Sequence, residues 1–334
     1  MIHSYKRMMN RLKIETTISA CLLAMMFFSC TTSDKVPSKD FVDYVNPYIG
    51  NISHLLVPTY PTVHLPNSML RVYPERGDFT SDRINGLPVV VTSHRGSSAF
   101  NLSPVQGDVS RPVVSYSYDL EKITPYSYSV YLDEDDIQVD YAPSHQAGIY
   151  HISFHTEGDN ALVINTRNGM LVTEENGVSG YQIIDNTPTK IYLYLETSQS
   201  PVKKGVLTEG KVDTERQEGK TIALFYGTES KLDVRYGISF ISEEQAKKNL
   251  QRDITTYDVK AVADAGRKIW NETLGKITVE GGSEDEKEIF YTSLYRTYER
   301  IINISEDGKY YSAFDGKIHE DGGTPFYTDD WIWD

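Results

Sequence analysis

Apolar and polar residues alternate along the first two thirds of the chain. Between about Phe41 and Ser242, short segments with a period of two are separated by Gly, Asn, Asp or Pro, which is the pattern of strands joined by turns. The segments that we expect to be strands are 88–92, 126–132, 137–141, 148–154, 161–165, 190–195, 221–226 and 232–238. Strands in such number without helical segments between them predict an all-β domain over residues 41–242, and we expect a large β-sandwich.

The period changes to that of helices after Ser242. Ser242 is the predicted N-cap of a first helix, with Gln245 at the third helical position. A second helix is expected from about Val259 to Leu274, with an imperfect apolar stripe that suits a helix between two domains. We therefore interpret residues 243–276 as linker helices.

A third helix is predicted from the capping box that Ser283 and Glu286 form. A short strand, Ile277 to Glu280, is expected before it. The apolar residues expected on one face of this helix are Phe290, Leu294, Tyr298 and Ile301. Residues 277–334 thus predict the start of a helical domain, and the whole chain is predicted to be mainly β.

The N-terminal segment 1–29 has the composition of an export signal. Basic residues precede an apolar run at 18–28, which is shorter than the roughly 20 residues that a spanning helix needs. Ser29 and Cys30 follow, and a small residue before cysteine resembles the lipobox of bacterial lipoproteins, although Phe27 stands where leucine is usual. We expect an exported bacterial lipoprotein of the periplasm or outer membrane, attached to the membrane by a lipid anchor at Cys30 and a tether over 30–40. The alternative is a cleaved signal that ends near a cysteine.

Composition narrows the classes of partner. The 47 acidic side chains outnumber the 33 basic ones, and the net charge of -14 repels phosphate backbones, so nucleic acid is not an expected partner. The two cysteines are Cys21 and Cys30, and removal of the signal leaves no pair for an intrachain disulfide. The 24 tyrosines are typical of half-buried strands or of surfaces that face sugars.

The last residues, 324–334, read like an interior segment. They are acidic and aromatic and include Trp331 and Trp333, whereas chain ends are usually polar and poor in large apolar groups. We therefore expect the sequence to be the front part of a larger protein.

Several segments together resemble glycoside hydrolase family 92, the calcium-dependent exo-acting α-mannosidases. The segment Tyr44–Gly50 is similar to the opening motif of that family. The further matching segments, in chain order, are 237–242, 270–271, 290–295, 307–311 and 333–334. The resemblance implies an N-terminal sandwich, a linker and the first part of an (α/α)6 catalytic barrel.

The sequence also departs from the family pattern. The residues after Gly50 lack the expected Gly- and His-rich stretch, and in the region 84–96 only His94 and a glycine correspond well. This indicates a divergent member with an altered linkage or sugar preference.

The resemblance implies an inverting mechanism that uses a general acid and a general base. In the family both carboxylates and the calcium ligands follow the Trp-Asp motif, which here is Trp333-Asp334. We therefore expect this chain to lack the catalytic acid and base and the calcium site, and to be inactive by itself. Its expected ligand is a mannose-containing glycan. The alternative class is a non-catalytic surface lipoprotein that serves as a glycan-binding or assembly module.

Five residues are candidates for sugar binding. Trp333 and Asp334 match the family's Trp-Asp, but they are equally explained as a barrel core residue and a helix N-cap. Asp330 can contact the sugar or belong to a solvated acidic turn. His94 and Arg95 can donate to sugar hydroxyls or form a loop ion pair.

An acidic run and a group of histidines lack the spacing that a metal site requires. The acidic run Asp133–Asp136 lacks the alternating spacing of a calcium loop and is expected to be a hairpin turn. The histidines at 145, 151 and 155 have no zinc-site spacing.

Overall fold

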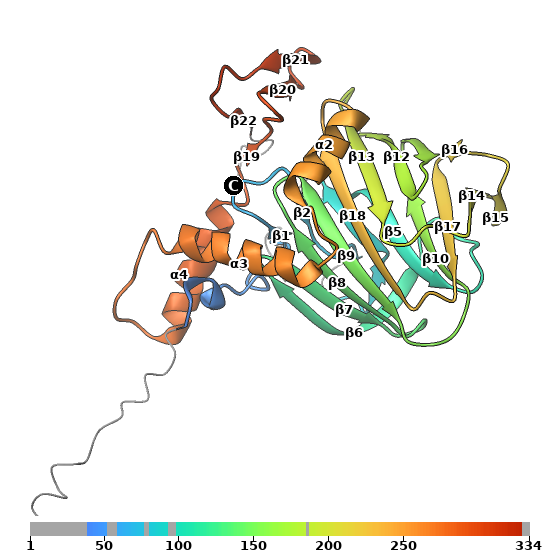
Figure 1. The fold of residues 1–334 in the computed structure, drawn as a ribbon. Coiled ribbons are helices and arrows are strands. Elements are labelled where there is room, and N and C mark those ends of the chain that lie inside the picture. Colours follow the sequence, from blue (N-terminus) through green and yellow to red (C-terminus); the bar gives the residue numbers. More distant parts are fainter. Residues whose placement is uncertain (1–38, 52–58, 77–79, 93–97, 185–186, 329–334) are drawn as a thin grey trace, which may run out of the picture. The chain divides into compact units, whose positions relative to one another are not determined.

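The computed structural model describes residues 39–51, 59–76, 80–92, 98–184 and 187–328. From Asp40 onward they belong to a single unit. Two large antiparallel sheets form most of it, and the helices follow them in the chain (Figure 1).

The larger sheet has ten strands. Their order is β16-β11-β12-β13-β18-β9-β8-β7-β6-β3. Their bounds are β3 Arg83–Asn85, β6 Ser115–Thr124, β7 Ser127–Leu132, β8 Ile137–Pro143, β9 Ala147–Phe154, β11 Gly169–Thr173, β12 Gly177–Ile183, β13 Lys190–Thr197, β16 Glu218–Gly219 and β18 Lys231–Ser239. The alternation that predicts these strands has a direct cause: β13 buries Ile191, Leu193 and Leu195, while the residues between them are half-buried.

The smaller sheet has six strands in the order β15-β14-β17-β10-β5-β4. Their bounds are β4 Leu87–Val91, β5 Ser98–Gln106, β10 Asn160–Asn165, β14 Lys203–Thr208, β15 Lys211–Asp213 and β17 Thr221–Gly227. Buried tyrosines connect the two sheets: the hydroxyl of Tyr150 donates to the carbonyl oxygen of Pro88 at 2.6 Å, and that of Tyr236 to Val89 at 2.7 Å. All eight strands predicted between residues 41 and 242 form, and the prediction of a mainly β fold is confirmed.

Helix α2 (Glu243–Asp253) packs on β18 and β13. The predicted N-cap is confirmed, because the Ser242 hydroxyl accepts from the backbone N–H of Gln245 at 3.1 Å. Gly237 in β18 permits the close approach of this helix, since a Cβ atom there would lie 2.2 Å from the carbonyl oxygen of Ala246.

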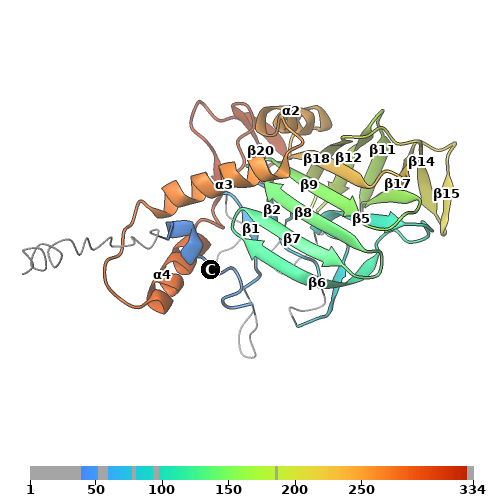
Figure 2. The same cartoon turned by 60° about the horizontal axis from the view of Figure 1, so that its bottom comes forward.

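Helices α3 (Val259–Leu274) and α4 (Glu284–Thr297) and the short 3-10 helix η1 (Phe41–Tyr44) share a second core. Helix α3 lies beside β8 and β9 (Figure 2). The core of this region is formed by Val42, Leu65, Trp270, Leu274, Tyr291 and Tyr295. The capping box of α4 is present as predicted.

Two details of this region differ from the sequence prediction. No strand forms at Ile277–Glu280, where Ile277 is exposed and the residues before it make a turn. Helix α4 buries Tyr291 and Tyr295, whereas Phe290, Leu294 and Tyr298 are only partly buried beside them and Ile301 lies beyond the helix and is exposed. The buried stripe is thus displaced by one residue from the predicted face.

Three two-stranded sheets complete the fold. They are β1 (Val63–His64) with β2 (Arg71–Val72), β19 (Ile302–Asn303) with β22 (Tyr327–Thr328), and β20 (Lys309–Ser312) with β21 (Lys317–Glu320). Among the described helices, none combines the length and apolar composition that crossing a bilayer requires. The predicted signal, the lipidation residue Cys30 and most of the tether lie outside the described residues.

Candidate functional site

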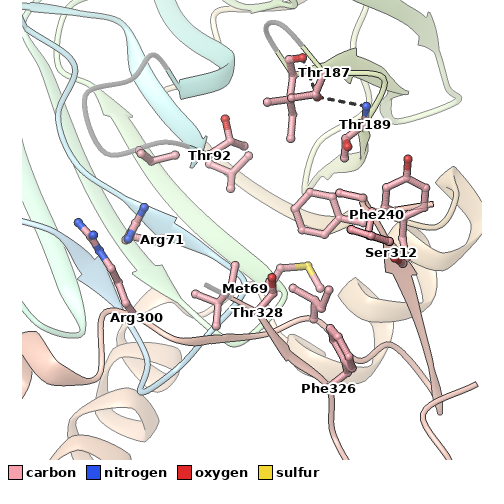
Figure 3. A pocket seen from close by; sticks show the side chains of 18 residues that line it. Met69, Arg71, Thr92, Thr187, Thr189, Phe240, Arg300, Ser312, Phe326 and Thr328 are labelled. Carbon is pink, nitrogen blue, oxygen red and sulfur yellow. Dashed lines mark hydrogen bonds between the residues drawn. The ribbon is translucent and has the colours of Figure 1, made fainter. Parts of the chain in front are cut away.

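A cavity of about 490 Å³ lies between the sandwich and the small sheets that follow α4 (Figure 3). One side is formed by β2, by β4 and the β12–β13 connection of the sandwich, and by Phe240 directly after β18, and the other side comes from β19, β20, β22 and the turn after β20. The lining residues are Met69, Arg71, Val90, Val91, Thr92, Ile184, Thr187, Thr189, Phe240, Arg300, Ile302, Ile304, Tyr311, Ser312, Ala313, Phe314, Phe326 and Thr328.

The cavity wall formed by the residues after α4 is stabilised by ring stacking and by backbone hydrogen bonds. The rings of Tyr310 and Phe326 stack at 3.8 Å and nearly parallel, so they fix the β20–β21 hairpin against β22. The backbone N–H of Ile304 donates to the carbonyl oxygen of Phe326 at 3.0 Å. At the hairpin turn, Phe314 is fully exposed to solvent.

The lining is mostly apolar, with a few polar groups. Arg71 and Arg300 supply guanidinium groups, and Thr187 and Thr189 lie together, the backbone N–H of Thr189 donating to the Thr187 hydroxyl at 3.2 Å (Figure 3). Apolar walls with a small number of placed polar groups are typical of sites for small organic ligands.

A largely buried cluster of charges supports this wall. Arg71 lies 3.5 Å from the carboxylate of Glu299, and Arg296 lies 3.2 Å from it. Burial alone would raise the pKa of Glu299, but these two guanidinium groups and other nearby positive charges lower that pKa below its ordinary value. Glu299 therefore stays ionised and holds Arg71 at the cavity.

The candidates for sugar binding that the sequence predicts, His94, Arg95, Asp330, Trp333 and Asp334, lie outside the described residues. Their roles stay predictions. Thr92 is the last described residue before His94 and Arg95, and Thr328 is the last described residue before Asp330, Trp333 and Asp334. Both threonines line the cavity.

Sequence reasoning missed the cavity residues that the structure describes. Arg71 belongs to none of the motifs or strands that the sequence predicts, and its own strand has only two residues. Phe240 lies inside a segment that matches the family, 237–242, and that match is a signal that could have drawn attention to it.

The acidic run forms a turn between β7 and β8, as predicted. Within it, Glu134 accepts from the backbone N–H of Ser117 at 2.8 Å and pairs with Arg83 at 2.8 Å. His151 lies 2.6 Å from Asp233, which raises the pKa of the imidazole. Glu134 and His151 therefore form ion pairs with residues of neighbouring strands.

Two family models match consecutive parts of the chain. Residues 44–239 match the glycosyl hydrolase family 92 N-terminal domain, and residues 245–334 match the glycosyl hydrolase family 92 catalytic domain. The chain belongs to glycosyl hydrolase family 92. The catalytic-domain match begins at residue 245, so it includes α3 and all but the first two residues of α2, whereas the sequence pattern predicts that both helices belong to a linker.

Solved structures of family 92 have the same fold. The inverting mannosidase BT2199 of Bacteroides thetaiotaomicron is 26% identical, with a TM-score of 0.78 over 88% of this chain and 44% of that one. The α-mannosidase BT3965 of the same organism is 19% identical, with a TM-score of 0.78 over 87% of this chain and 45% of that one. The chain thus spans less than half the length of these enzymes. No curated protein sequence matches it significantly.

Proposed function

We propose that the protein recognises α-mannosides in glycans, as part of an exo-acting, inverting α-mannosidase. The observation that carries this proposal is the match of both family 92 domains in consecutive order along the chain. Further support comes from the likeness to a solved inverting mannosidase at 26% identity. An α-mannosidase with the same fold has been solved in complex with mannoimidazole.

We assign the cavity to glycan binding. A pyranose ring has apolar C–H faces and a rim of hydroxyl groups, so it suits a cavity whose apolar walls carry a few guanidinium and hydroxyl groups.

Inversion requires a general acid and a general base on opposite sides of the glycosidic bond. We assign neither role to a described residue. Among those residues there is also no group of three or more His, Cys, Asp or Glu side chains that could hold a metal, so they do not fit a calcium site.

The test is a calorimetric titration of the chain with methyl α-D-mannopyranoside and, separately, with methyl α-D-glucopyranoside. A preference of about tenfold or more for the mannoside is expected, because the two sugars differ only in the orientation of the 2-hydroxyl, which a few placed hydrogen-bonding groups can distinguish. Equal affinity, or binding of neither sugar, would contradict the proposal. We expect no calcium-dependent release of mannose by this chain, and release would show that it contains an acid and base pair.

We also propose that the protein is exported and anchored to the membrane through a lipid on Cys30. Support comes from the basic segment, the short apolar run and the small residue before the cysteine. In Triton X-114 partitioning the wild type should enter the detergent phase, and Cys30→Ser should move it to the aqueous phase. Unchanged partitioning of the variant would refute the anchor.

A further inference from the structure

Glu306 is a carboxylate enclosed between two parts of the fold. It lies between β19 and β20 and is only 1% exposed. Its backbone pairs with Lys309, with N–H to carbonyl distances of 2.6 and 3.1 Å, so the segment that carries the side chain is itself held in place. Within the described part of the chain, no ion pair of 4 Å or less reaches this carboxylate.

The neighbours of Glu306 are donors. The backbone N–H of Phe240 donates to Oε1 at 2.9 Å, and the side-chain amide of Asn249 donates to Oε2 at 2.7 Å. The orientation of that amide is fixed by its other contacts, since Asn249 also donates to the carbonyl oxygen of Ile238 at 2.9 Å and accepts from Gln245 at 3.0 Å. The environment therefore requires a group that only accepts hydrogen bonds.

Burial of a carboxylate that forms no ion pair costs free energy, which its hydrogen bonds must offset. The groups that donate these bonds therefore indicate the structural role of Glu306. Burial raises the pKa of Glu306, and the hydrogen bonds from Ser239, Phe240 and Asn249 lower it by less. The positive charge of Arg252 also lowers the pKa of Glu306, but the guanidinium group of Arg252 pairs with the carboxylate of Asp307 at 2.7 Å.

The two sides of the cavity meet at Glu306. Phe240, which the carboxylate holds, lies on the sandwich side of the lining, and Ile304, two residues before Glu306, lies on the other. The intervening Ser305 fixes a third lining residue, because its hydroxyl accepts from the backbone N–H of Phe326 at 2.8 Å. One carboxylate therefore determines how the end of β18 sits relative to β19 and β22.

We propose that Glu306 is a positioning residue for the glycan cavity, whose carboxylate fixes Phe240 relative to Ile304 and Phe326. The nature of the ligand rests on the proposed function, whereas the link between the two walls does not. A glutamine at this position keeps the size of the side chain but presents an NH₂ group to one of two donors, so it breaks one contact and loosens the wall.

The experiment compares Glu306→Gln with two control variants. Asp307→Asn alters a neighbouring carboxylate that is nearly half exposed and that bonds to Gln245 and Arg252 of α2, neither of which lines the cavity. Ile222→Val removes a buried methylene in β17, which gives a comparable loss of stability inside the sandwich. Each variant is measured for its urea unfolding, for hydrogen exchange at the Phe240 amide and for affinity to methyl α-D-mannopyranoside.

Glu306→Gln should speed exchange at the Phe240 amide about tenfold and weaken mannoside binding by about the same factor, as expected for one lost buried hydrogen bond. Neither control variant should show faster exchange at the Phe240 amide or weaker mannoside binding, even where it is no more stable than Glu306→Gln. Wild-type exchange at Phe240 in Glu306→Gln would overturn the proposal, as would equal loss of affinity in Ile222→Val. If the wild type binds no mannoside but exchange at Phe240 still rises in Glu306→Gln alone, the positioning role is supported and the assignment of the glycan is refuted.

Discussion

The side-chain amide of Asn46 donates a hydrogen bond of 2.8 Å to the carboxylate of Glu288, which lies 242 residues later in the chain. The backbone N–H of Asn46 also donates to the Thr292 hydroxyl at 2.9 Å, and Arg296 donates to the carbonyl oxygen of Pro47 at 2.7 Å. The segment that resembles the opening motif of family 92 is thus bound along helix α4. These bonds join the N-terminal part of the described chain to α4, the helix that begins at the capping box.

Replacing Asn46 should weaken this connection. Asn46→Ala removes the bond to Glu288 and the one that its side-chain oxygen accepts from the Tyr48 N–H at 3.0 Å, so unfolding in urea should become easier by about 2 kcal/mol. A double-mutant cycle with Glu288→Ala should give a coupling of about 1 kcal/mol. Glu284→Ala removes another carboxylate of α4, which pairs with Lys287, and should show no coupling to Asn46. Equal coupling to both carboxylates would contradict this account.

The contact between the two sheets can be tested at Tyr150. Tyr150→Phe leaves the ring in the core but removes the donor to the Pro88 carbonyl oxygen, which then stays buried without that bond, and the expected loss is about 2 kcal/mol. Tyr194→Phe is the matched control, because that hydroxyl is partly exposed and lies 3.4 Å from Glu196; its effect should stay within about 0.5 kcal/mol. Similar losses in the two variants would show that the inter-sheet bond contributes little.

Period and capping allowed much of the fold to be predicted from local sequence. Strands such as β13 have one buried face, and the Ser283 and Glu286 pair starts α4. Strand β5 was missed because nearly all of its residues are buried, polar ones such as Asn101 included, so no alternation appears, and Pro104 within it argues against a strand. In α4, periodicity predicts the buried face only to within one residue. The face that is actually buried depends on the packing of Tyr291 against the rings of η1.

The cavity could not be predicted in the same way. Arg71 belongs to a strand of two residues, and Arg300 and Phe326 come from turns and short strands near the other end of the chain, so no local pattern brings them together. Glu306 reads in sequence as one acid of a polar turn. Its burial depends on Phe240 and Asn249, which follow from the packing of α2 against the end of β18.

The packing of α2 can be tested at Gly237. A Cβ atom there would overlap the carbonyl oxygen of Ala246 and lie 2.8 Å from the Leu250 nitrogen, so Gly237→Ala must push the helix away from β18. We expect a loss of about 3 kcal/mol in urea unfolding. Gly281→Ala is the control: nothing lies within 4 Å of the added carbon, and its positive φ of 80° alone should cost about 1 kcal/mol. A smaller loss at Gly237 than at Gly281 would show that α2 accommodates the methyl group.

His64 makes stability depend on pH. Its ring is fully buried, its Nδ1 lies 2.9 Å from the Leu65 carbonyl oxygen, and it stacks on Tyr295 with centroids 5.0 Å apart. Burial lowers the pKa of His64 from 6.5 to about 4, although Glu299 and the bond to Leu65 act in the opposite direction. Between these two values the unfolded chain binds more protons than the folded one. The contribution is therefore complete above pH 6.5 and is lost as pH falls toward 4, by about 3 kcal/mol in total.

The comparison with His64→Phe isolates this effect. Phenylalanine keeps an aromatic ring against Tyr295 but cannot bind a proton, so it removes the titration whatever constant cost it adds to folding. Urea unfolding measured from pH 7 to pH 4 should give a shallower loss of stability for His64→Phe than for the wild type, with a slope smaller by up to about 1.4 kcal/mol per pH unit inside the window. Parallel curves for wild type and His64→Phe would mean that His64 binds its proton equally well in the folded and unfolded protein, and burial would then not be the cause of its behaviour.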